Sequence, residues 1–170
     1  MSRSLVIALL LACVLAGCGT EKDVPREAPQ TAPRPSGKGA CALLMQEEID
    51  GLFGSAVGEG SSESLEGGVE LCTWPAGEDP ALLFQIEPAA SNVTAAVDLG
   101  EGYRTVEIEG MSGPAALSLE AGKETVAVLA LSASDRTFTV SPIGLGIGNG
   151  SEKLEKLKAL LELAATRPVS

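Results

Sequence analysis

Histidine is absent from the 170 residues, and aromatic residues make up only 3% of them. Without histidine, Ser-His-Asp and Cys-His catalytic arrangements are excluded, together with the most common general base. The motifs Gly-x-Ser-x-Gly and Ser-x-x-Lys are also missing. Carboxylates that could pair include Glu47/Glu48, Glu78/Asp79 and Glu107/Glu109. Five aromatic side chains are few for the deep cleft of a glycosidase. We therefore expect solvated carboxylates, no enzymatic activity and no cofactor.

Lysine and arginine are scarce, with 12 residues against 23 aspartates and glutamates, which gives a net charge of −11. From residue 41 to residue 103 there are twelve acidic residues and no basic one. Nucleic acids and anionic lipid headgroups bind through basic residues, so we expect neither as a partner of this segment. A basic protein, a divalent cation or a neutral sugar would be tolerated. No Asp-x-Asp-x-Asp-Gly loop indicates calcium, and we expect no metal site. The acidic excess also has a simpler use, which is solubility.

The leading apolar run covers residues 5–17 and follows a short head whose basic residue is Arg3. A helix that spans a bilayer needs about 20 residues, and this run has 13. A basic head followed by a short apolar run is typical of a cleaved secretory signal. The run ends in Leu15-Ala16-Gly17-Cys18, a small-residue box before a cysteine. We therefore predict a signal peptide over residues 1–17.

The sequence Leu-Ala-Gly-Cys resembles the lipobox of bacterial lipoproteins. The resemblance implies a diacylglyceryl thioether on Cys18, often with a further acyl chain such as palmitate on the new amino group. Two or more chains give stable anchoring, at about 0.8 kcal/mol for each buried CH₂. We therefore expect a lipoprotein that is anchored through Cys18 to the extracytoplasmic face of the cell membrane. The alternative is a soluble secreted protein that is cleaved beside a cysteine.

Removal of residues 1–17 leaves 153 residues with a net charge of −12, a length that suits one domain and a tether. Residues 18–39 are the predicted lipidated N-terminus and tether, because prolines alternate there with polar and charged residues. These prolines are Pro25, Pro29, Pro33 and Pro35. At about 3.1 Å per residue, the segment after Cys18 would extend up to ~65 Å from the lipid. Residues 40–168 are predicted to form a single domain.

Cys41 and Cys72 are the two cysteines left in the domain once Cys13 departs with the signal and Cys18 carries lipid. Two cysteines in an oxidising compartment usually pair. In the chain-entropy model, a bridge that closes a loop of about 31 residues raises the free energy of unfolding by roughly 3.5 kcal/mol. A metal site or a redox dithiol is the alternative, but each lacks its usual companions, histidine and Cys-x-x-Cys. We predict a structural disulfide.

Hydrophobic periodicity from residue 41 onward predicts mixed helix and strand. Residues 45–53 are expected to form a short helix that ends at Gly54, and residues 91–99 a weaker one. Alternation predicts a hairpin of residues 69–74 and 82–87, and further strands at residues 103–109, 115–119, 125–132 and 136–140.

Residues 151–165 predict an amphipathic C-terminal helix with Leu154, Leu157, Leu161 and Ala164 in one stripe. The glycine-rich segment 144–150 fits no dinucleotide or Walker motif, and we expect a flexible loop that ends in a helix cap at Asn149 or Ser151. The predicted class is α+β: an antiparallel sheet of five to six strands, flanked by the short N-terminal helix and the amphipathic C-terminal helix.

Three segments resemble an actinobacterial lipoprotein family known as domain of unknown function 3558. They are Cys41-Ala-Leu-Leu-Met-Gln-Glu-Glu-Ile-Asp-Gly-Leu-Phe-Gly54, Cys72-Thr-Trp74 and Gly110-Met-Ser-Gly-Pro-Ala-Ala116. The resemblance implies a helix tethered to a strand by the Cys41–Cys72 bridge, with Trp74 beside it, and carries no catalytic residues. Met45 stands where the family has threonine, and a second cysteine pair is missing. A more distant relation to mycobacterial envelope lipoproteins with a PsbP-like or Mog1-like sheet is the alternative.

Two functions of different class follow from these features. The first is a non-catalytic, membrane-anchored envelope lipoprotein that binds a surface protein or polymer through its sheet or its acidic face. The second is a carrier that holds a lipid or a small hydrophobic ligand in an apolar cavity, since the interior is rich in Leu, Val and Ala. The sequence assigns no binding residues to either.

Overall fold

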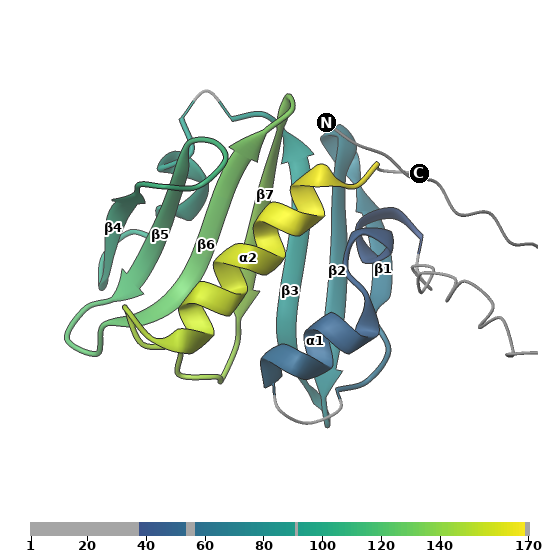
Figure 1. Cartoon of the computed structure of the whole chain (residues 1–170), viewed down its shortest axis with the longest axis horizontal. Helices are drawn as coiled ribbons and strands as arrows, with labels where there is room; N and C mark the ends of the chain where they lie inside the picture. The colour runs from purple at the N-terminus through teal and green to yellow at the C-terminus, as the bar shows by residue number, and fades with distance from the viewer. Residues whose placement is uncertain (1–37, 54–56, 91, 169–170) are drawn as a thin grey trace, which may run out of the picture. The chain divides into compact units, whose positions relative to one another are not determined.

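The computed structural model describes residues 38–53, 57–90 and 92–168, which form a sheet with two α-helices on one face (Figure 1). The predicted signal peptide, Cys18 and residues 18–37 of the predicted tether lie outside the described residues. The strands are β1 (Ser61–Leu65), β2 (Val69–Ala76), β3 (Asp79–Pro88), β4 (Tyr103–Ile108), β5 (Ala115–Glu120), β6 (Thr125–Ala133) and β7 (Arg136–Pro142). The helices are α1 (Gln46–Phe53) and α2 (Glu152–Thr166), with the short 3-10 helices η1 (Gly39–Leu43), η2 (Glu66–Gly68) and η3 (Ala95–Val97).

The sheet is antiparallel throughout, in the order β1-β2-β3-β7-β6-β5-β4. The predicted α+β class and the two flanking helices are therefore confirmed. The described residues form seven strands, one or two more than expected, because β1 has the sequence Ser-Ser-Glu-Ser-Leu and all five residues are exposed. A polar edge strand shows no apolar alternation, so periodicity does not reveal it.

The helix expected at residues 91–99 is only the three-residue η3. The side chain of Asn92 accepts hydrogen bonds from the amide and the hydroxyl of Thr94, at 3.0 and 2.7 Å. Such local bonds compete with helical backbone bonds and favour turns. The prediction of a longer helix was therefore wrong.

The main core lies between the sheet and the two α-helices. Figure 1 shows α1 and α2 on the same face of the sheet, and α2 packs against β6 and β7. The predicted stripe of α2 is buried, and Leu160 joins it. The side chains that fill the layer from the sheet include Trp74, Leu82, Phe84, Leu129 and Phe138, all at most 2% exposed. The stripe predicted for α2 is therefore confirmed.

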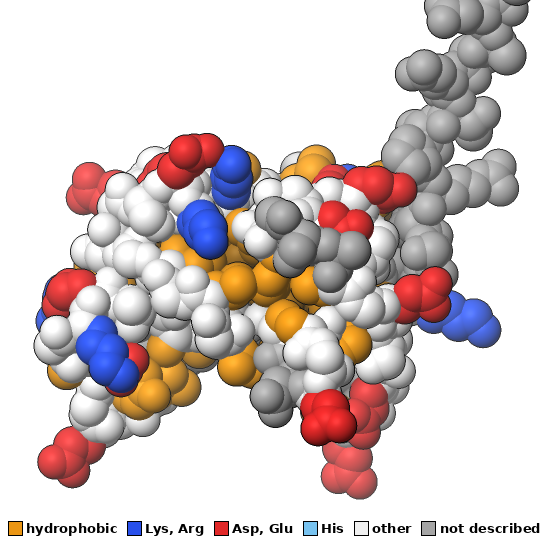
Figure 2. Space-filling model, turned by 90° about the horizontal axis from the view of Figure 1, so that it is seen from below, with side chains coloured by type: hydrophobic (Ala, Val, Ile, Leu, Met, Phe, Trp, Pro, Cys, Tyr) orange, Lys and Arg blue, Asp and Glu red, His pale blue; other side chains and the backbone are white. Residues whose placement is uncertain are grey.

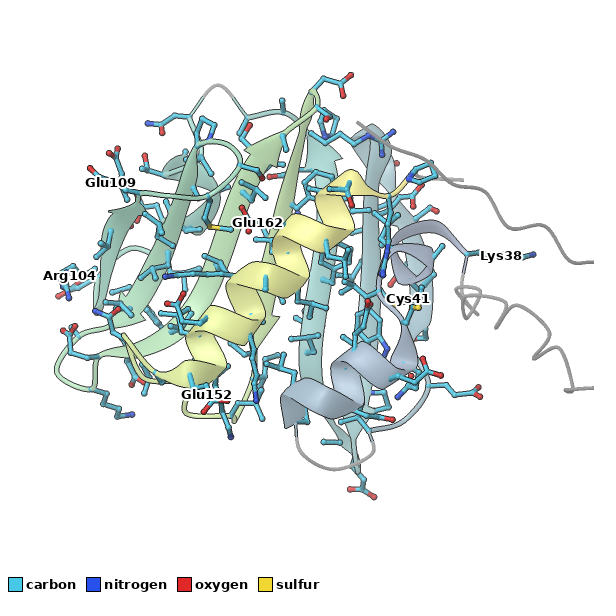
Figure 3. All side chains as sticks on the ribbon, in the orientation of Figure 1. Lys38, Cys41, Arg104, Glu109, Glu152 and Glu162 are labelled. Atoms are coloured by element: carbon cyan, nitrogen blue, oxygen red, sulfur yellow. A yellow bond between two sulfur atoms is a disulfide. The ribbon has the colours of Figure 1, made fainter. Side chains whose placement is uncertain are left out.

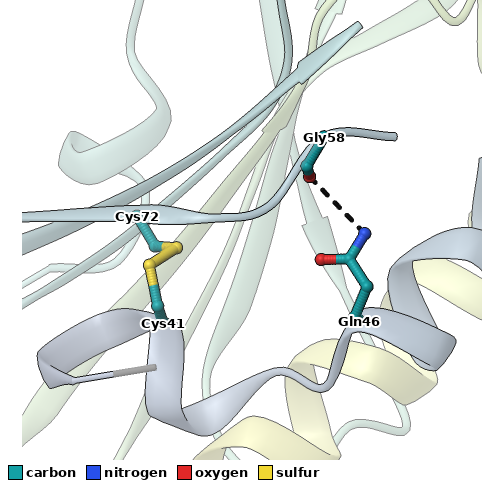
Figure 4. Close-up of a disulfide and its surroundings, with 4 residues drawn as sticks. All are labelled: Cys41, Gln46, Gly58 and Cys72. Carbon is teal, nitrogen blue, oxygen red and sulfur yellow. Dashed lines mark hydrogen bonds between the residues drawn. A yellow bond between two sulfur atoms is a disulfide. The ribbon is translucent and has the colours of Figure 1, made fainter. Parts of the chain in front are cut away.

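The predicted disulfide is present and joins Cys41 of η1 to Cys72 of β2, with 5.1 Å between the two Cα atoms (Figure 4). Both cysteines are buried beside Trp74. Gly60 lies against Trp74 and Cys72, since a Cβ on it would stand 2.8 Å from the indole of Trp74 and 2.9 Å from the sulfur of Cys72. The bridge therefore fixes η1, and the start of α1 after it, to the second strand.

An ion pair that the sequence analysis did not predict joins the two ends of the domain. Arg167, just after α2, donates to both carboxylate oxygens of Glu48 at 2.6 and 2.8 Å and to the carbonyl oxygen of Leu43 at 2.6 Å. The amide of Met45 donates to the same carboxylate at 2.8 Å. Burial alone would raise the pKa of Glu48, but the hydrogen bonds from Arg167 and Met45 and the Arg167 charge outweigh it and lower the pKa.

The glycine-rich segment 144–150 is held against β6 rather than free. The amide of Val126 donates to the carbonyl of Ile147 at 2.8 Å, and the amide of Asn149 donates to the carbonyl of Glu124 at 2.9 Å. The N-cap of α2 is Ser151, whose hydroxyl accepts from the amide of Leu154 at 3.2 Å. Of the two predicted caps, Ser151 is confirmed. Among the described helices, none is both long and apolar enough to cross a membrane.

Candidate interaction surface

The two faces of the sheet are covered differently. Cys72 and Trp74 of β2 and Phe84 of β3 point toward the helices, so the alternate residues of these strands point the other way. On that second face, η3 packs against β5, β6 and β7, where Val93, Val97, Ala116 and Ala130 form a small second core. Thr137 of β7 lies on the face that η3 covers and is buried. The second face over β1, β2 and β3 remains partly exposed.

We call this exposed region the β1–β3 open face. It consists of nine residues: Ser61, Glu63, Leu65, Val69, Leu71, Thr73, Leu83, Gln85 and Glu87. All of them are half-buried or exposed, although four have large or branched aliphatic side chains.

The four aliphatic residues form a continuous diagonal band across the three strands. Leu65 of β1 lies directly opposite Val69 of β2, and Leu71 follows Val69 on the same face. Leu83 of β3 lies opposite Thr73, which makes it the diagonal neighbour of Leu71. Direct cross-strand partners stand about 5 Å apart and diagonal ones about 7–8 Å, so neighbouring side chains in the band are within reach of one another. Leu65 is 45% exposed, and the band is therefore open to a partner.

Acidic and amide groups flank the band. Glu63 lies opposite Leu71 on one side, and Gln85 lies opposite it on the other. The amide nitrogen of Gln85 donates to Glu87 at 3.2 Å, which turns this amide toward the carboxylate and leaves its carbonyl oxygen as an acceptor. The three strands lie within residues 41–103, which include no lysine or arginine. The charged side chains of the face, Glu63 and Glu87, are therefore both acidic.

β1 is an end strand of the sheet, so one of its edges pairs with no strand of the described chain. It is connected to β2 by η2, whose Gly67 and Gly68 both have a φ of 79°. Such backbone favours glycine and makes the tight reversal that places β1 beside β2. The Gly-Gly pair was the sequence signal that could have revealed β1, and with it the contribution of Leu65 to the band.

The carboxylate pairs singled out in the sequence lie at three separate places in the fold. Glu48 is engaged by Arg167. Glu78 is exposed in a turn, and the side chain of Asp79 lies outside the description. Glu107 and Glu109 line an open hollow of about 330 Å³ together with Asn92 and Ser132. Glu109 lies at the end of β4 (Figure 3). No group of three metal-ligating side chains occurs in the described part of the chain.

A second hollow of about 380 Å³ lies between β4, the start of β6 and the glycine-rich segment 144–150. Tyr103, Glu120 and Lys123 line it. The hydrogen bond from Lys123, at 2.6 Å, lowers the pKa of Glu120, and the same contact raises the pKa of Lys123. Because the two charges neutralise each other, this hollow has no strong preference for an ion.

An apolar groove of about 330 Å³ lies between α1 and α2. Gly51, Leu52, Ala159, Leu160 and Leu163 line it, together with Glu48 and Lys156. Leu163 is 41% exposed. Figure 2, which shows the molecule from below, has hydrophobic side chains gathered near the middle and charged side chains around them.

Of the predicted site residues, Cys41 and Cys72 are brought together, and Cys18 lies outside the described residues. The sequence named no binding residues, whereas the strand register assembles the β1–β3 open face from three strands. No family model, no curated protein and no solved structure matches this chain. The resemblance to the actinobacterial lipoprotein family stays a prediction.

Proposed function

We propose that this chain is a non-catalytic envelope lipoprotein that binds another surface protein or polymer through the β1–β3 open face. The observation that carries the proposal is the aliphatic band of Leu65, Val69, Leu71 and Leu83, which stays partly exposed on a face that η3 covers over β5, β6 and β7. Contiguous apolar surface framed by polar groups is typical of interaction sites. Interfaces of this kind have an apolar centre and a polar rim, and Glu63, Gln85 and Glu87 supply such a rim.

The location of the protein at the membrane is part of the same proposal. Lipid chains on Cys18 would hold the protein on the extracytoplasmic face of the membrane, and residues 18–39 would let the domain reach up to ~65 Å from it. Cys18→Ala is expected to release the protein from the membrane fraction or to block its processing. Cell fractionation and the mass of the mature chain measure this. An unchanged membrane fraction with an unchanged mass would refute the lipid anchor.

Binding through the open face is tested by cross-linking on intact cells. We expect a discrete adduct for the wild-type chain, and its loss when Leu65→Asp and Leu83→Asp are combined. Leu163→Asp, on α2 and on the opposite side of the sheet, is the matched control and should keep the adduct. Near-ultraviolet circular dichroism of the buried Trp74 verifies that each variant is folded. An adduct that survives the double substitution would contradict the choice of face, and no adduct in any chain would contradict the function.

The groove between α1 and α2 favours a second function, the carrier of a lipid or small hydrophobic ligand. Its volume of about 330 Å³ lies at the lower end of the range for ligand sites, and its lining is mostly apolar. Native mass spectrometry of the purified chain would then show a bound small molecule, and Leu163→Asp would release it. A wild-type mass without ligand after purification from membranes would contradict this function.

A further inference from the structure

We infer that the partner segment on the β1–β3 open face is a cationic, extended polypeptide that carries aliphatic side chains between its lysines or arginines. This inference rests on the proposed function and names the chemistry of its partner. It combines the spacing of the aliphatic band, the sign of the surrounding charge and the position of the face at the edge of the sheet.

The spacing of the band matches an extended chain. Val69 and Leu71 are alternate residues of one strand, so their side chains stand about 6.7 Å apart along it. Alternate side chains of an extended polypeptide have the same spacing and can lie against both residues. Leu65 and Leu83 continue the contact on either side. A partner segment with aliphatic residues at every second position therefore covers the band.

The charge of the face selects the polar residues of the partner. Glu63 and Glu87 flank the band, and neither takes part in an ion pair with a lysine or arginine of the described residues. Facing lysines or arginines would gain attraction from these carboxylates, whereas an acidic segment or an anionic polymer would be repelled. Amine and guanidinium groups also match the acceptor-only chemistry of carboxylates.

The same face disfavours a neutral sugar. Sugar-binding surfaces usually present aromatic rings, and none of the nine residues of the open face is aromatic. The face lies at the edge of the sheet, where a polypeptide can extend beyond β1 without meeting another strand of the described chain. Among the partners that the acidic composition tolerates, a polypeptide therefore fits best.

The test uses the full-length mature chain in neutral phosphatidylcholine nanodiscs and a labelled peptide of about twelve residues. The peptide alternates leucine or valine with lysine and polar residues, and a control peptide has glutamate in place of each lysine. Fluorescence anisotropy measures the dissociation constant at several salt concentrations. We expect binding of the lysine peptide to weaken as salt is raised, and no binding of the glutamate peptide.

Substitutions in the chain separate the two contributions. Leu71→Asn should weaken binding at least about tenfold, since it places an amide in the apolar centre and leaves the charge unchanged. Leu65→Asn, at a more exposed position, provides the same test if Leu71→Asn fails to fold. Glu63→Gln combined with Glu87→Gln should weaken binding about threefold to tenfold and flatten the salt dependence. Leu99→Asn, between η3 and β4 and with the side chain 44% exposed, should leave the dissociation constant unchanged.

The outcomes distinguish this inference from the function it rests on. Equal binding of the lysine and glutamate peptides, or binding that ignores every substitution on the open face, would overturn the inference. If the cross-linked partner on cells contacts the face through an acidic or uncharged segment, the inference is wrong but the proposed function holds. If the lysine peptide binds as expected while no adduct forms on cells, the chemistry of the face holds and the proposed function fails.

Discussion

Replacement of Arg167 by methionine is expected to lower the free energy of unfolding by about 2 kcal/mol. The guanidinium donates three hydrogen bonds, two of them to Glu48 and one to the carbonyl of Leu43. Hydrogen bonds that involve a charged group contribute about 1.5–3 kcal/mol. The two side chains are 18% and 23% exposed, so water replaces part of what is lost. Methionine keeps the aliphatic stem and removes only the charge and the donors.

A double-mutant cycle measures the coupling free energy between Glu48 and Arg167. Glu48→Gln removes the charge but keeps an acceptor for the amide of Met45, and the cycle combines it with Arg167→Met. Because both groups act through the same contact, we expect the double variant to be little less stable than either single one. Urea unfolding followed by tryptophan fluorescence measures each stability. The exposed Glu152–Lys156 pair, at 2.9 Å within α2, is the control and should show no measurable coupling.

The contribution of the pair should depend on pH in a defined direction. The pKa of Glu48 is lowered in the folded chain, so the folded state binds the proton less readily than the unfolded state does. The stabilisation is then fully present above the ordinary glutamate pKa of about 4.3 and is lost as the pH falls through the lower folded pKa. Coupling that is below about 0.5 kcal/mol at pH 7, or that grows as the pH falls, would refute the reasoning.

Three further substitutions test the stability of the fold by denaturant unfolding. Removal of the bridge by Cys41→Ala with Cys72→Ala should cost about 3–4 kcal/mol, since the loop spans 31 residues, and a loss below about 1 kcal/mol would contradict this account. Ser151→Ala removes the N-cap of α2 and should cost about 1 kcal/mol; an unchanged midpoint would show that the cap bond is dispensable. Gly113→Ala should cost about 1–3 kcal/mol because a methyl group there collides with the backbone of β6. Gly51→Ala, in α1 with open space around it, is the matched control and should stabilise by about 0.5–1 kcal/mol, so equal losses at both positions would contradict the collision.

Local periodicity was sufficient for the elements that bury one regular face. The stripe of α2 and the alternation of β2 arise from contacts with a single large core, and both are visible in a window of a few residues. The strand β1 has no such pattern because it lies at the edge with every residue exposed. The length of the helix at η3 was overestimated, because the hydrogen bond that Asn92 accepts from the amide of Thr94 favours a turn over a longer helix.

The candidate site was beyond local prediction for a different reason. Val69 and Leu71 could be assigned to one side of a strand, but their continuation into Leu65 and Leu83 depends on the register of three strands. The Glu48–Arg167 pair joins residues 119 positions apart in the sequence, and no spacing rule anticipates it. The disulfide was predictable because only two cysteines remained after the signal and the lipidation site were assigned.

A photoreactive residue at position 71, compared with one at position 163, tests most directly whether the β1–β3 open face is the binding surface. Each residue is introduced into the full-length chain in intact cells, irradiated, and the cross-linked peptides are sequenced. We predict a specific adduct from position 71, formed with a lysine- or arginine-containing segment of an envelope protein, and none from position 163. An adduct from position 163 alone, or none from position 71 in a correctly folded and anchored chain, would contradict the account.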